Sequence, residues 1–208
     1  MKLPEIAKFG DFTSTDKYVD QFGGFSFIVK NALHISEFFN NPPTKMADVV
    51  LNTEEGCSYN KSLYGFIDGP EYKSALTRFR PVEEHKDSFT KDEGWVYFIC
   101  YNGYIMKIGH TTKTLTARTG SYGSGGRSRQ AAASSTNFFI SELNYTAVTG
   151  GLDVELYAVR IAPDRKKVVV DGEDYCMDMI HSSKIHESAY IRKYRDMKGV
   201  LPPLCTQG

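Results

Sequence analysis

The chain has 208 residues, 41% of them hydrophobic, and equal numbers of acidic and basic residues give it a formal net charge of zero. This composition is typical of a globular protein with one core domain and an appendage, and the short apolar runs exclude a membrane-spanning protein. The N-terminus lacks the apolar stretch of a signal peptide, and the four scattered cysteines form no Cys-x-x-Cys pair, so we expect a cytoplasmic protein with free thiols.

The charges are unevenly distributed along the chain. Residues 1–93 hold 15 acidic and 11 basic residues, whereas residues 94–141 hold no acidic residue and five basic ones. The five are Lys107, Lys113, Arg118, Arg127 and Arg129. A local basic face attracts a polyanion whatever the total charge is. The stretch therefore indicates a nucleic-acid-binding surface, and chance clustering on a solvated surface is the alternative.

Residues 1–92 are expected to form a mainly helical accessory region. Proline disfavours helix in the residue before it, so Asn41-Pro42-Pro43 should separate two helices. The predicted helices are residues 16–22, 27–39 and 44–51. Acidic residues cluster just before Gly94 and mark a boundary. We therefore divide the chain into an accessory region, residues 1–92, and a second region, residues 93–208.

The second region is expected to alternate strands with helices. Runs of aromatic and β-branched residues predict strands, and serine or threonine before an amphipathic run predicts the start of a helix. The predicted strands are residues 95–101, 104–108, 154–161 and 166–170. The predicted helices are residues 112–122, residues 135–144, and a last helix from residue 182 or 183 to about residue 197.

Asn102-Gly103 predicts a β-hairpin between the first two strands of this region. A two-residue loop would place Tyr97 opposite Ile108, whereas a three-residue loop with Gly103 in a left-handed conformation places it opposite Lys107. We expect the three-residue loop, because it gives the hairpin one apolar core face, made of Val96, Phe98, Cys100, Tyr104, Met106 and Ile108. Lys107 would then favour the phenolate of Tyr97. A surface tyrosine packed on a lysine stem is the alternative.

The helix that follows the hairpin places two further side chains near this pair. Arg118 and Tyr122 are four residues apart and therefore share one helical face. Because the connection is short, the helix must begin beside the end of the second strand. The side chains expected to converge in one basic concavity are Tyr97, Lys107, His110, Arg118 and Tyr122.

At these residues the sequence resembles the GIY-YIG nuclease superfamily, and within it the small GIY-YIG type II restriction endonucleases of the Helicobacter kind. Gly94-Trp-Val-Tyr97 is similar to the first motif and Lys107-Ile-Gly109 to the second, with lysine where the family usually has tyrosine. The likeness continues through Arg118, Ser121-Tyr122, residues 134–139, residues 183–187 and Cys205-Thr-Gln207. It covers about residues 94–208 and does not explain residues 1–92.

The resemblance implies an α+β fold with a small three-stranded antiparallel sheet flanked by helices, to which the mainly helical N-terminal extension is added. It also implies hydrolysis of a DNA phosphodiester with one divalent metal ion, Mg²⁺ or Mn²⁺, in each active site and no small-molecule cofactor. Glu187 would ligate the metal, and a plain surface glutamate is the alternative. Such a hard cation prefers oxygen ligands and keeps several waters, so one carboxylate would suffice.

The resemblance assigns the other roles as well. Tyr97 would be the general base for the attacking water, Lys107 would stabilise its phenolate, and Arg118 with Tyr122 would bind the scissile phosphate. His110 would support Tyr97 or the phosphate. The expected DNA-binding residues are Lys113, Arg127 and Arg129. An ordinary tyrosine is a poor base at neutral pH, so these roles need a cation beside the phenol or a metal that acidifies the water.

We therefore expect a type II restriction endonuclease that acts on double-stranded DNA as a homodimer, with one active site for each strand. Residues 1–92 would form the dimer or clamp the DNA, because they hold several spare apolar side chains. These are Phe22, Phe25, Phe27, Ile28, Leu33, Phe38 and Phe39. The alternatives are a phage or homing-type GIY-YIG nuclease, and a non-catalytic DNA-binding protein on the same scaffold.

Overall fold

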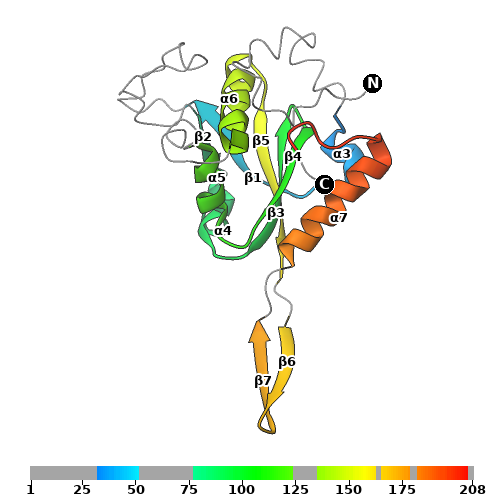
Figure 1. The fold of residues 1–208 in the computed structure, drawn as a ribbon. Helices are drawn as coiled ribbons and strands as arrows, with labels where there is room; N and C mark the ends of the chain where they lie inside the picture. Colours follow the sequence, from blue (N-terminus) through cyan, green and yellow to red (C-terminus); the bar gives the residue numbers. More distant parts are fainter. Residues whose placement is uncertain (1–31, 52–76, 124–134, 163–164, 179–181, 206–208) are drawn as a thin grey trace.

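A computed structural model describes residues 32–51, 77–123, 135–162, 165–178 and 182–205. These residues form an α+β fold around an antiparallel sheet of five strands in the order β2-β1-β5-β3-β4 (Figure 1). The strands are β1 (Thr44–Leu51), β2 (Thr77–Pro81), β3 (Gly94–Tyr101), β4 (Tyr104–Thr111) and β5 (Val154–Ile161). The expected three-stranded sheet is thus extended by β1 and β2, which pair with each other and, through β1, with β5.

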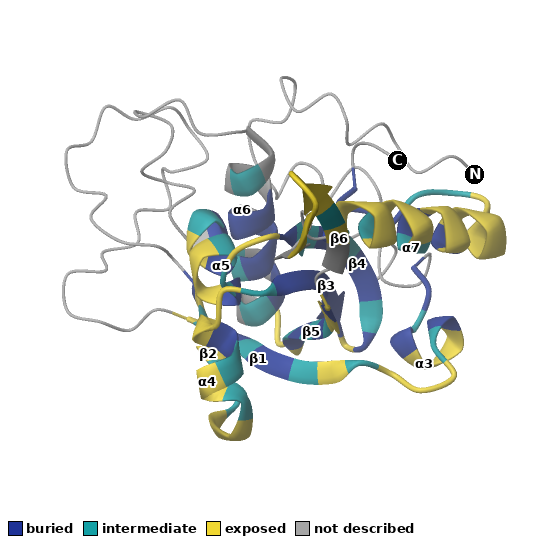
Figure 2. Cartoon of the chain, turned by 90° about the horizontal axis from the view of Figure 1, so that it is seen from below, coloured by how far each residue is buried: buried dark blue, intermediate teal, exposed yellow. Residues whose placement is uncertain are grey.

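Helices cover both faces of the sheet. The helices α5 (Leu115–Gly123) and α6 (Ser135–Thr149) pack on one face, and α7 (Ser183–Lys198) packs against β3 and β4 on the other (Figures 1 and 2). Two apolar cores result, one between the sheet and α5 with α6, the other between the sheet and α7. All eight residues of β3 are buried, because its side chains enter the two cores alternately.

The prediction of a helix over residues 44–51 is wrong, because these residues form β1. Val49 and Val50 favour a strand, and the backbone of β1 pairs on both sides, with β2 and with β5. This tertiary pairing outweighs the moderate helix propensity of the segment. Of the helix predicted at 27–39, only Ile35–Phe38 (α3) is helical among the described residues, and the helix predicted at 16–22 lies outside them.

The described part of residues 1–92 is therefore not mainly helical. It combines β1 and β2 with three short helices, α3, η2 (Glu83–His85) and α4 (Lys86–Thr90). Met46, Ala47 and Val49 of β1 belong to the same core as Trp95 of β3. The role in dimerisation or DNA clamping that the sequence predicts for residues 1–92 stays a prediction.

The hairpin between β3 and β4 differs from the expected register. Its loop has two residues, Asn102 and Gly103, with φ angles of 47° and 79°, as a type I′ turn requires. An extra residue, Met106, then bulges out of β4, so that Ile99 lies opposite Lys107 and Tyr97 lies opposite Gly109. The expected three-residue loop and the direct Tyr97–Lys107 pair are therefore wrong.

The bulge has a packing cause, since both faces of this hairpin are covered. It sends Ile105 and Ile108 into the core under α7 and Met106 into the opposite core. A regular ladder alternates strictly and could not place these residues in this way. The expected register placed Met106 and Ile108 on one apolar face, whereas the structure places them in opposite cores.

The remaining elements follow the sequence closely. The predicted strand at 154–161 matches β5, and the helices predicted from residues 135 and 183 begin there as α6 and α7. Strands β6 (Arg165–Val170) and β7 (Glu173–Asp178) form a separate two-stranded ribbon that projects from the body in Figure 1. Among the described residues, no helix is long and apolar enough to span a membrane.

Candidate active site

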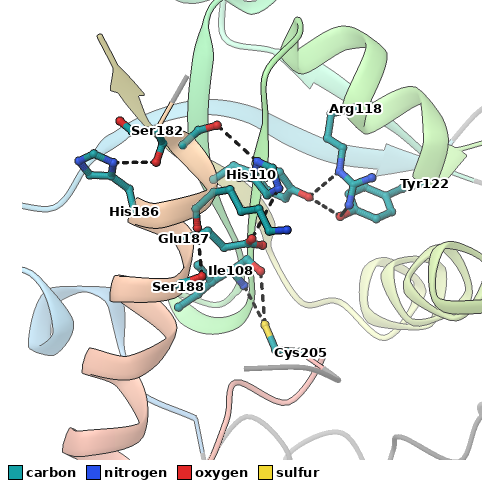
Figure 3. A network of polar contacts seen from close by, with 12 residues as sticks. Ile108, His110, Arg118, Tyr122, Ser182, His186, Glu187, Ser188 and Cys205 are labelled. Carbon is teal, nitrogen blue, oxygen red and sulfur yellow. Dashed lines mark hydrogen bonds and ion pairs between the residues drawn. The ribbon is translucent and has the colours of Figure 1, made fainter. Parts of the chain in front are cut away.

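Two phenols and one guanidinium meet between β3 and α5. The hydroxyl oxygens of Tyr97 and Tyr122 lie 2.5 Å apart, and either could donate the hydrogen bond. Arg118 donates from Nε to the Tyr97 hydroxyl over 2.7 Å and from Nη2 to the Tyr122 hydroxyl over 3.1 Å (Figure 3). A single side chain thus fixes both phenols, and we call these three residues the tyrosine–arginine cluster.

Local sequence explains how α5 presents its part of the cluster. Thr111 Oγ1 accepts a bond from the Lys113 amide, and Thr114 Oγ1 accepts one from the Ala117 amide, so threonines cap the start of the helix directly after β4. Residues four apart share a helical face, which brings Arg118 and Tyr122 together. The predicted convergence of these two residues with Tyr97 is present in the structure.

The electrostatics of the cluster follow from its burial. Burial alone would lower the pKa of Arg118, but the oxygens of Tyr97 and Tyr122 outweigh it and raise that pKa above its usual value. Burial, reinforced by Tyr97, raises the pKa of Tyr122 well above its usual value, although Arg118 acts in the opposite direction. At neutral pH, Arg118 is therefore charged and Tyr122 is a neutral phenol that can donate a hydrogen bond.

Gly109 leaves the space that the Tyr97 phenol occupies. A Cβ atom at Gly109 would lie 2.3 Å from the Tyr97 hydroxyl oxygen and 2.4 Å from the adjacent ring carbon Cζ. Real Cβ atoms do not approach other atoms this closely, so any larger residue at this position would displace the phenol. The glycine of the second motif is thus explained by close contact with the tyrosine of the first.

His110, the next residue of β4, points toward α7. Its Nε2 atom lies 3.7 Å from Oε2 of Glu187, and its Nδ1 atom lies 3.3 Å from the buried hydroxyl of Ser183 (Figure 3). Glu187 and Ser183 are four apart and occupy the first turns of α7. Gly109 lies against Tyr97 and the next residue, His110, faces Glu187, so adjacent residues of β4 contact the tyrosine–arginine cluster on one side and α7 on the other.

Lys107 does not contact Tyr97 in the manner that the sequence predicts. It lies opposite Ile99 in the register and is half-buried. Burial raises the pKa of the Cys205 thiol, and Lys107 partly opposes that rise, which places the ammonium near this thiol. Lys113 is exposed at the start of α5, and Arg127 and Arg129 lie outside the described residues.

Three features of this site were missed in the sequence. Arg118, rather than Lys107, is the cation that contacts the Tyr97 hydroxyl. The sequence assigned no role at the site to Ser183 or Cys205, and the structure brings each of them to β4. The acid-free stretch was a usable signal for Arg118, because no carboxylate nearby in sequence could have neutralised it.

The donor set near Glu187 fits a cation that keeps most of its own waters. Among the described residues there is no group of three or more His, Cys, Asp or Glu side chains that could hold a metal ion. Glu187 offers two carboxylate oxygens, and its side chain is 20% exposed. Mg²⁺ and Mn²⁺ accept such a sparse set of protein ligands, whereas zinc in a structural site requires four.

No family model matches the chain, and no curated sequence is significantly similar to it. The structure is similar to that of restriction endonuclease HPY188I in complex with product DNA, with 22% identity and a TM-score of 0.47 over 86% of this chain and 90% of that one. It is also similar to a mutant of bacteriophage T4 EndoII, with 16% identity and a TM-score of 0.49 over 82% of this chain and 98% of that one. At this level of similarity, the chemistry of the site has to be argued from its own side chains.

Proposed function

We propose that this chain is a divalent-metal-dependent endonuclease that hydrolyses phosphodiester bonds of double-stranded DNA at a short specific site, as a type II restriction endonuclease of the GIY-YIG kind. The observation that carries the proposal is the buried tyrosine–arginine cluster, with Arg118 bonded to both Tyr97 and Tyr122. Arg118 is half-buried and bonded to both phenols, so its positive charge is held beside the two hydroxyl oxygens. Arginine's planar fork matches phosphate oxygens.

Tyr97 is the general base in this proposal. Its oxygen accepts from Arg118, and Tyr122 can donate to it, so positive charge and a neutral donor surround the oxygen that, as a phenolate, would receive a proton from the attacking water. Arg118 thereby takes the role that the sequence assigned to Lys107. Gly109 keeps the phenol in place from the β4 side.

Arg118 and Tyr122 bind the scissile phosphate. The bonds to the two phenols use two of the five N–H donors of the guanidinium, and the half-buried side chain can turn the others toward an anionic oxygen. The positive charge of Arg118 would stabilise the negative charge that builds up on the phosphate oxygens in the transition state. Lys107 adds positive charge on the face of β4 that also carries Gly109 and lies toward Tyr97.

Glu187 would hold the metal ion, and His110 keeps its carboxylate in place from the β4 side. A bound Mg²⁺ or Mn²⁺ would supply a more acidic water and charge stabilisation at the phosphate. Lys113, Arg127 and Arg129 would contact the DNA backbone, and two copies of the chain would serve the two strands. Residues 1–92 would support that dimer or clamp the DNA.

The proposal is tested by incubating the full chain with mixed-sequence DNA and sequencing the ends. We expect discrete, identical ends in Mg²⁺ or Mn²⁺ and no cleavage in EDTA. Glu187→Gln should bind DNA without cutting it, whereas the matched control Glu173→Gln, on the projecting ribbon, should cut normally. Scattered ends would indicate a different kind of nuclease. DNA binding without any cleavage under all metal conditions would mean that the scaffold only binds DNA.

A further inference from the structure

β4 is one of the two edge strands of the sheet, and two short segments, one around Leu33–Ile35 and one around Leu204–Cys205, cover outward backbone groups of the β4 side of the hairpin. Beside the hairpin turn, the Ile35 amide donates to the Gly103 carbonyl and the Ile105 amide donates to the Leu33 carbonyl, each over 2.8 Å. Farther along β4, the C-terminal segment covers the edge. The Leu204 amide donates to the carbonyl of the bulged residue Met106 over 2.8 Å. An uncovered edge would leave these groups unpaired.

Cys205 continues this cover with its side chain. The Ile108 amide donates to Cys205 Sγ over 3.3 Å, and the thiol donates to the Ile108 carbonyl over 3.3 Å. A thiol can both donate and accept, so one side chain satisfies both outward groups of one edge residue. Leu204 is buried in the core under α5 and α6, and Cys205 in the core under α7, so the segment wraps around the edge of the sheet.

Ile108, to which Cys205 is hydrogen-bonded, lies between two residues of the candidate site. Ile108 follows Lys107 and precedes Gly109, the residue that lies against the Tyr97 phenol. The thiol also lies within electrostatic reach of Lys107, Glu187 and Tyr122. Figure 3 shows Cys205 bonded to Ile108 beneath this group. The thiol thus supports the part of β4 from which the site is built.

We propose that Cys205 is a positioning residue: its two hydrogen bonds to Ile108 hold Lys107 and Gly109 of β4 in register with Tyr97 of β3. Cys205 takes no part in the chemistry. The expected effect of Cys205 on the rate of DNA cleavage rests on the proposed nuclease function. Its expected effect on the position of β4 does not. The C-terminal segment at Leu204 and Cys205 would then help to keep the geometry of the site, although it lies far from Tyr97 in sequence.

Cys100 provides a matched control. It is a second free cysteine, buried in β3 in the same core under α7, and burial raises the pKa of both thiols. We expect Cys205→Ala to lower kcat about 10- to 100-fold with little change in DNA affinity, since small displacements at a reacting centre have effects of this size. Cys100→Ala should keep a nearly normal kcat. Cys205→Ser should recover most of the rate, because its hydroxyl can also donate and accept.

Hydrogen exchange gives a readout that does not depend on activity. In Cys205→Ala, amides 107–109 should exchange faster than in the wild type, while those of α6 should not change. In Cys100→Ala, amides 107–109 should stay protected. Equal losses of kcat in the two alanine variants, or unchanged exchange at 107–109, would overturn the proposal. If the wild type cuts no DNA, the proposed function fails, and the exchange data alone decide whether Cys205 positions the strand.

Discussion

The sharpest prediction concerns Gly109→Ala, which adds one methyl group beneath the Tyr97 phenol. The new Cβ would lie 2.3 Å from the phenol oxygen and 2.4 Å from Cζ, whereas ordinary contacts begin near 3.4 Å. The phenol or the strand must therefore move by about 1 Å. Tyr97 is fully buried and bonded over 2.5 Å to Tyr122 and over 2.7 Å to Arg118, so such a shift stretches or breaks both hydrogen bonds.

We expect Gly109→Ala to lower the cleavage rate by about 10²-fold, the effect of a displacement of about 1 Å at a reacting group. Overpacking should also lower the free energy of unfolding by about 1–3 kcal/mol. The matched control is Gly120→Ala in α5, where a Cβ would meet no atom within 4 Å. That change should be neutral or stabilise the helix by up to about 1 kcal/mol.

The measurements are plasmid cleavage under single-turnover conditions and urea unfolding of both variants. Tyr97→Phe in the Gly109→Ala background gives a further check, because it removes the hydroxyl but leaves Cζ in the way. The double variant should cut no more slowly than Tyr97→Phe alone, since both changes disable the same group. A Gly109→Ala enzyme with normal rate and stability would show that the phenol has room to move and that its place is not critical.

Three further predictions follow from the site and its surroundings. Tyr97→Phe should lower turnover by at least about 10²-fold with nearly unchanged DNA binding, and a near-normal rate would mean that Tyr97 only packs. Neutralising Arg127 and Arg129 should reduce the slope of log affinity against log salt by about one unit for each lost phosphate contact, and an unchanged slope would move the DNA face elsewhere. Burial raises the pKa of Tyr194 from 10.0 to about 12. The stability that its neutral phenol contributes is therefore fully present below pH 10 and is lost as pH rises to about 12, at a cost of about 2–3 kcal/mol. Tyr194→Phe should flatten the decline of unfolding free energy in this window, and an equally steep decline in the variant would assign it to other tyrosines.

Local patterns in the sequence were sufficient for several parts of this protein. The Arg118–Tyr122 spacing depends only on helical periodicity, and the cap that Thr114 forms at the start of α5 depends on residues within one turn. The strand at 154–161 could be located from its β-branched and aromatic residues alone. These features were predictable because each is decided by neighbours in the chain.

Long-range packing decided the rest. Residues 44–51 became a strand because two partners, β2 and β5, lay beside them, and no local pattern shows such partners. The hairpin register depended on helices that cover both of its faces, which made the bulge at Met106 favourable and put Gly109, rather than Lys107, opposite Tyr97. The contact of Arg118 with Tyr97 and the bond of Cys205 to Ile108 join residues far apart in the chain. These contacts form only in the folded chain. Buried polar groups need hydrogen-bond partners there, and the packing of distant segments decides which residues lie close enough to provide them.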